Sequence, residues 1–354
     1  MRNLFLVNKI AEGSLVMSRD GSTPTDRPIF VVGCPRSGTT MLQLMLHAHP
    51  RIAIPPETRF LLAGYAKRAE FGDLTDAANR RRLAAWIAES AQFGDLGLDP
   101  AATIEAIVAA PPTLGSAFGT VFKMYADRFG KPRWGDKRPL YLRHLPTILR
   151  LFPDAQIINI MRDGRDCVSS LKETPWKPAE FDTLIDYWTQ SADASLLAAR
   201  RYPDDVYHQV RYEDLVADPE PHLRRICAFL EEDFDPAMTR PNRLASVAVP
   251  EWKTWHTLTH KEPTTERVAS WKSRLTADEV RRCETAFGDR LAKFGYLPSL
   301  PVPRSARMRY DARLIARHRL GPARSAARDL WTQVRSGQGE PEVAARLTSR
   351  QLAG

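Results

Sequence analysis

The chain has 354 residues, of which 43% are hydrophobic and 26% are charged, and its formal net charge is +9. These proportions are ordinary for a soluble globular protein, and the length suffices for one large α/β domain or two modest ones. No run of about eighteen apolar residues occurs, which excludes a transmembrane helix. The apolar stretch Leu4–Val7 is interrupted too soon by Asn8 and Lys9 for a signal peptide, so we expect a cytoplasmic protein.

The positive charge is concentrated at the C-terminal end. Residues 301–354 hold eleven Arg against four Asp or Glu, a net charge of +7, so residues 1–300 carry only +2. We expect an N-terminal arm over 1–27, a main domain over 28–300 and a basic, helical tail over 301–354. The tail suits weak contact with an anionic membrane surface or an acidic substrate, or it is a solvated helical extension. It contains no motif for specific nucleic-acid recognition.

The four cysteines, Cys34, Cys167, Cys227 and Cys283, lie far apart and form no CxxC or Cys/His pattern. Such patterns mark zinc and redox sites, so we expect reduced thiols and no metal.

A glycine loop between a strand and a helix is the first motif along the chain. The run Ile29–Val32 is apolar and partly β-branched, which predicts a buried strand. Gly33 and Gly38 follow with four residues between them, then the hydroxyl pair Thr39–Thr40 and a helix through Met41–Leu46. This arrangement directs backbone N–H groups and the positive end of a helix dipole at one point, which suits a phosphate.

The loop differs from that of an ATP or GTP enzyme at one position. Such an enzyme carries a lysine directly after the second glycine, where this chain has Thr39, and the cation of this loop is Arg36. Taken alone, the pattern also fits a strand-to-helix turn without a ligand.

Helical periodicity then covers much of 60–128, with breaks near Gly72, Gly94 and Pro111–Pro112. A short extended segment and loop is expected at Arg133–Pro139, followed by a helix over 141–151.

The second strand, Ala155–Met161, ends in a cation instead of an acid. A P-loop NTPase normally ends this strand in an aspartate that helps to hold magnesium, but here Arg162 follows. Arginine is a forked donor for phosphate, and Ser170 in the next helix adds a hydroxyl donor. The chain thus offers two phosphate sites, neither with an evident metal. The alternative is a plain helix start at which Arg162 and Asp163 pair with neighbours.

The remaining elements complete an alternating pattern. We expect a helix over 180–200, a third strand over Val206–Tyr212, a helix from Asp218 to Leu230, loop-rich sequence over 232–265 and a helix over 277–292. Alternating strands and helices predict an α/β fold with a P-loop-like, doubly wound, mostly parallel central sheet flanked by helices. Ligands of such sheets bind at the carboxyl ends of the strands, where all three loops lie.

Together these motifs resemble the sulfotransferase family, whose sulfuryl donor is 3'-phosphoadenosine 5'-phosphosulfate (PAPS). The resemblance runs from Pro28 to Tyr296. Pro35–Thr40 looks like the family's 5'-phosphosulfate loop, Arg162 with Ser170 looks like its 3'-phosphate motif, and Arg211–Pro219 resembles the segment whose tyrosine contacts the adenine. The donor-binding residues that the resemblance implies are Arg36, Ser37, Gly38, Thr39, Thr40, Arg162, Ser170 and Tyr212.

Within the family, the chain is most similar to the branch of tyrosylprotein sulfotransferases and bacterial sulfotransferases. This rests on His49–Pro50, Glu57–Arg59 and Asp136–Lys137. The resemblance implies that Glu57 is the general base and that Lys137, with Arg36, assists at the transferring group. The implied reaction moves a sulfuryl group from PAPS to an acceptor hydroxyl, and it gives a sulfate ester and adenosine 3',5'-bisphosphate (PAP) without a metal.

Two departures from the branch are visible. Tyrosylprotein sulfotransferases are anchored in a secretory membrane, and we expect no anchor here, which argues against a protein-tyrosine acceptor. The Arg-Lys-Gly segment of the family is also absent. Arg267, Ser270, Trp271 and Lys272 stand in the comparable region, and the sequence leaves open which of them contacts the donor.

The acceptor and the oligomeric state are not readable. The residue types over 60–130 and 240–265, which we expect to shape the acceptor pocket, fit a small molecule, a carbohydrate, a lipid or a peptide. His256 and His260 are weaker candidates for that pocket, and we expect His47 and His49 to be capping or packing groups. The two alternative functions are a P-loop nucleotide kinase or phosphotransferase and a non-catalytic nucleotide-binding protein.

Overall fold

The structure is a computed structural model that describes residues 26–175, 180–241 and 263–299, with Ser305, Met308 and Ala312. The chain divides into two compact units after Leu275. The predicted arm and nearly all of the predicted tail lie outside the described residues, so the ranges of the three predicted segments stay predictions. Among the residues that are described, no helix is both long enough and apolar enough to cross a membrane.

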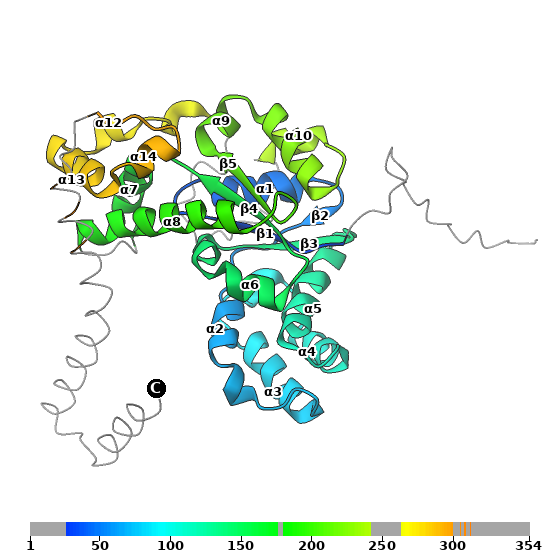
Figure 1. The fold of residues 1–354 in the computed structure, drawn as a ribbon. Helices are drawn as coiled ribbons and strands as arrows, with labels where there is room; N and C mark the ends of the chain where they lie inside the picture. The colour runs from blue at the N-terminus through cyan, green and yellow to red at the C-terminus, as the bar shows by residue number, and fades with distance from the viewer. Residues whose placement is uncertain are drawn as a thin grey trace, which may run out of the picture. The chain divides into compact units, whose positions relative to one another are not determined.

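In the described part of the first unit, five parallel strands form one sheet in the order β2-β3-β1-β4-β5 (Figure 1). The strands are β1 (Ile29–Gly33), β2 (Ile52–Ala53), β3 (Arg133–Lys137), β4 (Gln156–Met161) and β5 (Tyr207–Arg211). The chain leaves β1 toward β2 and β3 on one side and later adds β4 and β5 on the other. The carboxyl end of β1 is therefore the switch point of the sheet, the place at which ligands of such sheets bind. The predicted parallel α/β fold is confirmed; β2 was not predicted, and the extended segment after residue 133 is β3.

Helices cover both faces of this sheet. They are α1 (Thr39–Ala48), α2 (Phe60–Ala66), α3 (Ala77–Ala88), α4 (Pro100–Ala109), α5 (Leu114–Asp127), α6 (Leu145–Leu151), α7 (Gly164–Lys172), α8 (Phe181–Arg201), α9 (Tyr212–Ala217), α10 (Pro219–Leu230) and α12 (Trp271–Arg274). Short 3₁₀ helices are η1 (Arg68–Phe71), η2 (Gly94–Leu96), η3 (Pro139–His144), η4 (Pro236–Thr239) and η7 (Thr265–Arg267).

Strand β1 is apolar throughout because both of its faces are buried. Phe30 and Val32 face a core that α5, α6 and η3 share. Ile29 and Val31 face the opposite core, which α1, α9 and α10 cover. Side chains alternate across a strand, so this run of residues serves both cores at once.

The segment from α2 to α5 is a helical lobe, coloured from blue to teal in Figure 1, and its breaks follow from its sequence. Asp76, Asp99 and Thr113 cap α3, α4 and α5, each accepting a hydrogen bond from a backbone N–H of the first turn. The predicted breaks near Gly72, Gly94 and Pro111–Pro112 fall between these helices and are confirmed.

In the second unit, α13 (Ala277–Phe287) and α14 (Arg290–Lys293) replace the single helix expected over 277–292. Thr276 and Glu279 form a capping box at the start of α13. Gly288 has a φ of 52° and ends that helix, which explains the break.

Candidate active site

The loop between β1 and α1 has the shape of an anion cradle. Arg36 and Gly38 both have positive φ, 70° and 100°. A Cβ atom at Gly38 would lie 2.6 Å from Cδ2 of Tyr212, so both the backbone conformation and the available space require glycine there. Gly38 is also the N-cap of α1 and offers no side-chain cap, which leaves the first N–H groups of the helix for another acceptor.

Two buried polar atoms at this cradle are left without a hydrogen-bond partner in the part of the chain that the structure describes. They are Oγ of Ser37 and Nε of Arg162. Both side chains are at least 95% buried. An unpaired buried donor costs about 1–3 kcal/mol, so these atoms suit an anionic ligand that accepts from both.

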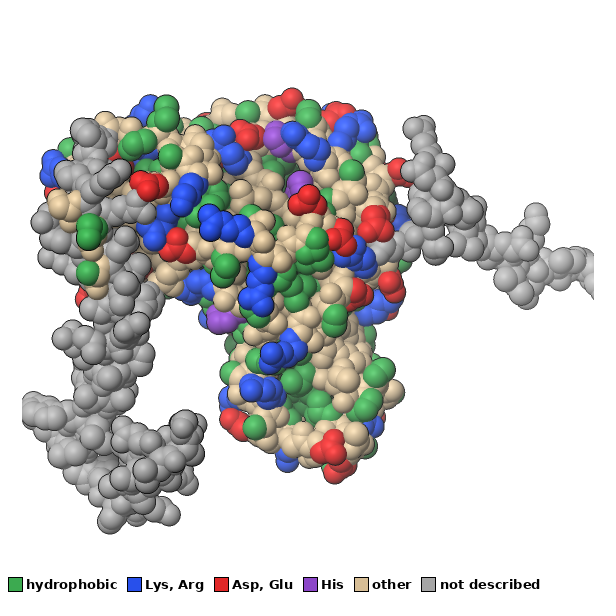
Figure 2. All heavy atoms as spheres, in the orientation of Figure 1, with side chains coloured by type: hydrophobic (Ala, Val, Ile, Leu, Met, Phe, Trp, Pro, Cys, Tyr) green, Lys and Arg blue, Asp and Glu red, His purple; other side chains and the backbone are tan. Residues whose placement is uncertain are grey.

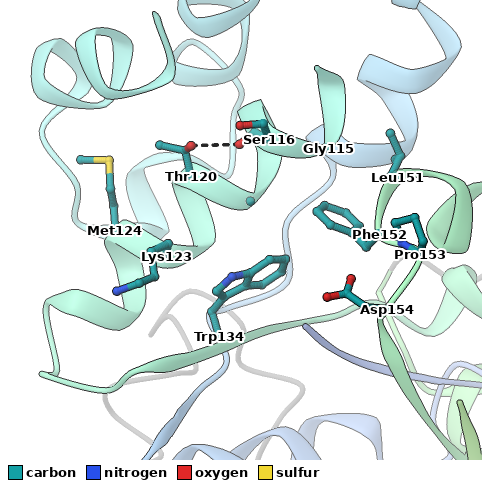
Figure 3. Close-up of a pocket in the computed structure, with 11 residues that line it drawn as sticks. Gly115, Ser116, Thr120, Lys123, Met124, Trp134, Leu151, Phe152, Pro153 and Asp154 are labelled. Atoms are coloured by element: carbon teal, nitrogen blue, oxygen red, sulfur yellow. Dashed lines mark hydrogen bonds between the residues drawn. The ribbon is translucent and has the colours of Figure 1, made fainter. Parts of the chain in front are cut away.

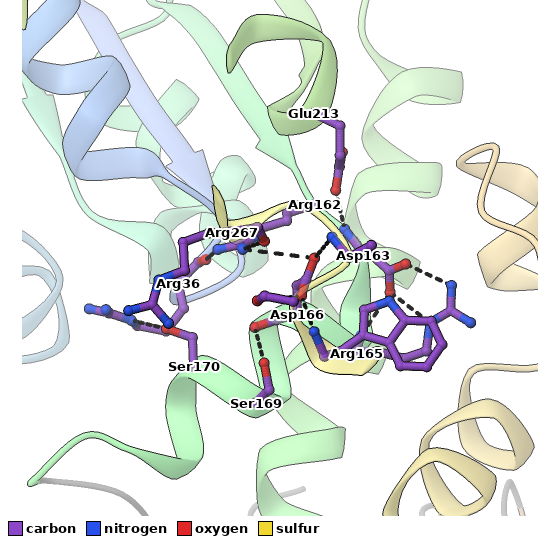
Figure 4. A network of polar contacts seen from close by, with 12 residues as sticks. Arg36, Arg162, Asp163, Arg165, Asp166, Ser169, Ser170, Glu213 and Arg267 are labelled. Carbon is purple, nitrogen blue, oxygen red and sulfur yellow. Dashed lines mark hydrogen bonds and ion pairs between the residues drawn. The ribbon is translucent and has the colours of Figure 1, made fainter. Parts of the chain in front are cut away.

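The two predicted phosphate sites are joined by direct contacts (Figure 4). Nε of Arg36 donates to Oγ of Ser170 at 2.9 Å, and Nη1 of Arg162 donates to the carbonyl oxygen of Arg36 at 3.1 Å. The loop after β1, which carries Arg36, and the turn between β4 and α7, which carries Arg162, therefore lie against each other. The structure brings Arg36, Arg162 and Ser170 together as the sequence predicted.

The arginines of this region repel one another. Burial first, then the positive charges of Arg162, Arg274 and Arg267, lower the pKa of Arg36. Such a cluster of cations favours the binding of a multiply charged anion, because the anion relieves their repulsion.

A buried carboxylate, that of Asp166, lies next to this arginine cluster. Asp166 of α7 is fully buried and lies 3.8 Å from Nη2 of Arg162. It also accepts hydrogen bonds from the N–H groups of Ala269 and Trp271 and from Oγ of Ser270, at 2.8–3.0 Å. Asp166 thereby fixes the segment after η7 against α7. The sequence analysis did not single it out, although its place one helical turn after Arg162 was a usable signal.

These contacts distinguish the four residues that the sequence left open as donor contacts, which are Arg267, Ser270, Trp271 and Lys272. Ser270 and Trp271 are engaged with Asp166, and the indole ring of Trp271 lies 4.1 Å from the guanidinium of Arg165. Lys272 is exposed. The carbonyl oxygen of Arg267 accepts a hydrogen bond from Nη2 of Arg162, and its charge acts on Arg36. Arg267 is therefore the member nearest to the cation cluster.

Tyr212 begins α9 directly after β5, next to the same cluster. Its ring lies under the guanidinium of Arg162, with 4.3 Å between the guanidinium carbon and the ring centre, and its edge meets Gly38. The fully buried Trp188 donates its indole N–H to the carbonyl oxygen of Arg162 at 2.9 Å. The position of Arg162 is thus fixed from both sides by aromatic residues, a role for Trp188 that the sequence did not indicate.

Glu57 and Lys137, for which the resemblance implied catalytic roles, form an ion pair. Nζ of Lys137 lies 3.0 Å from Oε2 of Glu57, with side-chain exposures of 5% and 29%. Lys137 ends β3 and is paired in register with Val31 on β1, two residues before Gly33. The pair therefore lies at the same sheet edge as the phosphate cradle, and Glu57 is its more open member.

The first acidic residue after β4, Asp163, bonds to a neighbouring arginine. Asp163 caps α7 and accepts from the backbone N–H, Nε and Nη2 of Arg165 at 2.7–3.0 Å. The carboxylate is therefore not directed into the cradle as it would be in a P-loop NTPase. Over 26–175, 180–241 and 263–299 there is no group of three or more His, Cys, Asp or Glu side chains placed to hold a metal.

The histidines at the end of α1 are packing groups. Nδ1 of His47 accepts from the N–H of Ile54 at 3.1 Å, and burial lowers the pKa of His47 to about 4. His49 contacts the carbonyl oxygen of Asp233 at 2.8 Å. His256 and His260 lie outside the described residues.

A pocket with a volume of about 410 Å³ lies away from this site (Figure 3). Its wall includes Trp134 near the start of β3 and Phe152–Asp154 just before β4, so it opens at the amino ends of the strands. It contains none of the predicted site residues.

Comparisons with known proteins agree with the geometry. Residues 28–236 match the profile of the sulfotransferase family. The nodulation protein NoeE of Sinorhizobium fredii is 28% identical over 92% of this chain and 77% of its own length. Protein-tyrosine sulfotransferase 1 of Danio rerio is 25% identical over 79% of this chain and 75% of its own length.

A solved structure shares the fold. The sulfotransferase domain of the Synechococcus PCC 7002 olefin synthase is 28% identical and superposes with a TM-score of 0.51, covering 78% of this chain and 98% of that domain. The family match spans more than half of the chain. The chain therefore belongs to the sulfotransferase family, and it is an enzyme of sulfuryl transfer.

Proposed function

We propose that the chain moves a sulfuryl group from PAPS to an acceptor hydroxyl and releases PAP. One observation supports this donor above all: two arginine-bearing turns meet around buried donors, Oγ of Ser37 and Nε of Arg162, that have no partner among the described residues. PAPS carries charged groups at two separate ends of one nucleoside, which matches two linked anion sites. The roles given to single residues below are part of this proposal.

The donor would be held from both ends. The loop amides, Arg36, Ser37, Thr39 and Thr40 take the 5'-phosphosulfate, with Gly38 giving the close approach of the backbone. Arg162 and Ser170 take the 3'-phosphate, and Arg267 adds its charge at this end. Tyr212 borders the adenine side. The network that fixes Arg162 before the donor arrives reduces the entropy lost on binding.

Glu57 acts as the general base. The acceptor O–H gives its proton to the Glu57 carboxylate while the oxygen attacks sulfur, and the bond between sulfur and the bridging oxygen of the 5'-phosphate breaks. The electron pair of that bond leaves with the phosphate, so the products are a sulfate ester and PAP. A positioned base contributes about 10²–10⁴-fold in rate.

Lys137 and Arg36 stabilise the charge that grows on the departing phosphate. A fixed hydrogen-bond donor that points at such developing charge stabilises the transition state by roughly a few kcal/mol. In the structure Lys137 is bonded to Glu57. We propose that the ammonium turns to the bridging oxygen once the donor is bound, which frees the carboxylate to accept the proton.

The acceptor class is a hydroxyl of a small molecule, carbohydrate, lipid or peptide. Among the relatives is an enzyme named protein-tyrosine sulfotransferase, so a phenol is one acceptor to test. Figure 2 shows several basic side chains on the face in view. Arg143 of η3, Arg150 of α6 and Arg68 of η1 are exposed. The cytoplasmic location and the membrane contact of the basic tail stay predictions.

The test uses the full chain with [³⁵S]PAPS and, in parallel, with [γ-³²P]ATP and Mg²⁺. Acceptors are p-nitrophenol, a tyrosine-containing peptide, a methyl glycoside and a cell metabolite extract. We expect a labelled sulfate ester and stoichiometric PAP from [³⁵S]PAPS. A labelled phosphate ester from ATP, together with no labelled sulfate ester from PAPS, would overturn the proposal in favour of a kinase.

A further inference from the structure

A buried carboxylate, that of Asp136, contacts the segments that carry Glu57 and Lys137. Asp136 precedes Lys137 on β3, and its side chain is fully buried. It accepts three hydrogen bonds. Oδ1 accepts from the N–H of Lys137 at 2.8 Å, and Oδ2 accepts from Oγ1 of Thr58 at 3.1 Å and from Oη of Tyr141 at 2.6 Å.

These three donors come from the loop that carries Glu57, from the end of β3, and from η3, which follows β3. Thr58 is the neighbour of Glu57 in the chain, and it is fully buried. Lys137 is the other member of the pair. Tyr141 lies in η3, immediately after β3, and its ring packs against Phe30 of β1 with centres 5.9 Å apart. One carboxylate therefore ties the Glu57 loop and the end of β3 to the centre of the sheet.

We propose that Asp136 is a positioning residue that holds Glu57 and Lys137 at their 3.0 Å separation, acting through the hydroxyl of Thr58. The inference rests on the proposed function. The hydrogen bond from Oγ1 of Thr58 to Oδ2 of Asp136 is a buried link between the residue next to Glu57 and the strand that carries Lys137. A shift of about 1 Å at a reacting group lowers rate by up to about 10²-fold, so a rigid connection at this point matters for turnover.

The chemistry of the network suits this role. A carboxylate buried without donors would be strongly unfavourable, but here each oxygen accepts at least one hydrogen bond. Burial raises the pKa of Asp136 to about 6, and the hydrogen bonds from Tyr141, Lys137 and Thr58 oppose that rise. The side chain is therefore ionised at neutral pH and can accept from all three donors at once.

The Thr58 hydroxyl gives the sharpest test because valine has nearly the same shape. We expect Thr58→Val to lower kcat about tenfold or more with [³⁵S]PAPS and the acceptor that gives the highest rate, while KM for PAPS and affinity for PAP stay near wild type. Thr58→Ser keeps the hydroxyl and restores most of the lost kcat. Thr103→Val is the matched control, since Thr103 is a buried threonine of α4 whose hydroxyl donates to the backbone carbonyl of Asp99.

A second variant, Asp136→Asn, replaces one acceptor oxygen by an N–H donor, and we expect a larger loss of kcat with the same unchanged PAP affinity. Crystal structures of Thr58→Val and Thr58→Ser add a readout that needs no acceptor. The contact between Glu57 and Lys137 should be longer or split in the valine variant and intact in the serine variant. If Asp136→Asn does not fold, the threonine series decides.

Three results would overturn the inference. The first is an unchanged kcat and an unchanged Glu57–Lys137 contact in Thr58→Val. The second is a parallel loss of kcat and PAP affinity, which would mean general damage to the fold. The third is failure of the proposed function itself, recognised separately because wild-type enzyme would then form no PAP, or because Glu57→Gln would transfer at the wild-type rate.

Discussion

At the scale of single residues, the groups that we propose for donor binding and those that we propose for the chemistry come largely from different strands. Arg162, proposed for donor binding, follows β4, whereas Glu57 follows β2 and Lys137 ends β3, on the other side of β1 in the strand order. Arg36, in the loop after β1, has both roles in the proposal. Substitutions on the two sides should therefore affect different measured quantities.

The base is tested by Glu57→Gln, which keeps the size of the side chain but removes its proton affinity. We expect kcat to fall by about 10²–10⁴-fold while PAP binds as it does to wild type. Glu105→Gln is the matched control, because Glu105 is an exposed glutamate of α4 that pairs with Arg81. Rapid-quench turnover with [³⁵S]PAPS measures the rate. An unchanged kcat in Glu57→Gln would remove this residue from the reaction.

Gly38 is a residue of the cradle that has little freedom to change. Gly38→Ala places a Cβ atom against the ring of Tyr212 at a φ of 100°, so we expect a loss of about 1–2 kcal/mol in the free energy of unfolding and much weaker PAP binding. Gly94→Ala is the control, because a Cβ atom there meets nothing within 4 Å. Chemical denaturation with and without PAP measures both effects. Equal behaviour of the two variants would show that the cradle is not strained.

At the scale of elements, the contact between α1 and the segment after β2 makes stability depend on pH. His47 accepts the N–H of Ile54 while neutral, and burial lowers its pKa from 6.5 to about 4. The unfolded chain therefore binds this proton below about pH 6.5 and the folded chain only below about pH 4. The free energy of unfolding falls as the pH drops through that window, by up to about 3 kcal/mol, and His47 has no such effect above it.

His47→Gln removes this titration and keeps an acceptor for Ile54. We expect the pH dependence between 4 and 6.5 to become flatter by the amount that His47 contributes. Asp136 titrates in an overlapping window with the opposite sign, since its raised pKa favours the folded state as it is protonated, but this contribution is common to both proteins. Urea denaturation at a series of pH values gives the difference. Parallel curves would contradict the assignment to His47.

The elements that the sequence predicts well are those with a local signal. The apolar run of β1, the glycines of its loop and the breaks between the helices of the lobe depend on neighbours in the chain, and the sequence places them within a few residues. Strand β2 has two residues, too few for any period. Strand β3, with the sequence Arg133–Lys137, is polar because its side chains form ion pairs and buried hydrogen bonds, so hydrophobic periodicity could show it only as an extended segment.

The residues of the candidate site, too, could be predicted from the sequence only where their signal is local. Arg36, Arg162 and Ser170 could be predicted because short spacings place them on loops at one sheet edge. The contacts of Asp166 with residues 269–271 and of Asp136 with Thr58 join positions 78 or more residues apart, and nothing local marks them. Long-range buried hydrogen bonds of this kind are decided by the folded arrangement and not by the pattern of a segment.

At the scale of the whole molecule, the family assignment and the anion cradle lead to one expectation. The enzyme should prefer a nucleotide with phosphates at both the 5' and 3' positions over one that lacks the 3'-phosphate. Arg162 is the group on which this preference depends, because it is the forked donor at the end of β4.

Titration calorimetry of the full chain with PAP and with adenosine 5'-monophosphate tests this most directly. We expect wild-type protein to bind PAP far more tightly, Arg162→Lys to lose at least about tenfold in PAP affinity with little change for the monophosphate, and Arg224→Lys, an exposed control on α10, to behave as wild type. No heat with PAP, or equal losses for both nucleotides in Arg162→Lys, would contradict the account.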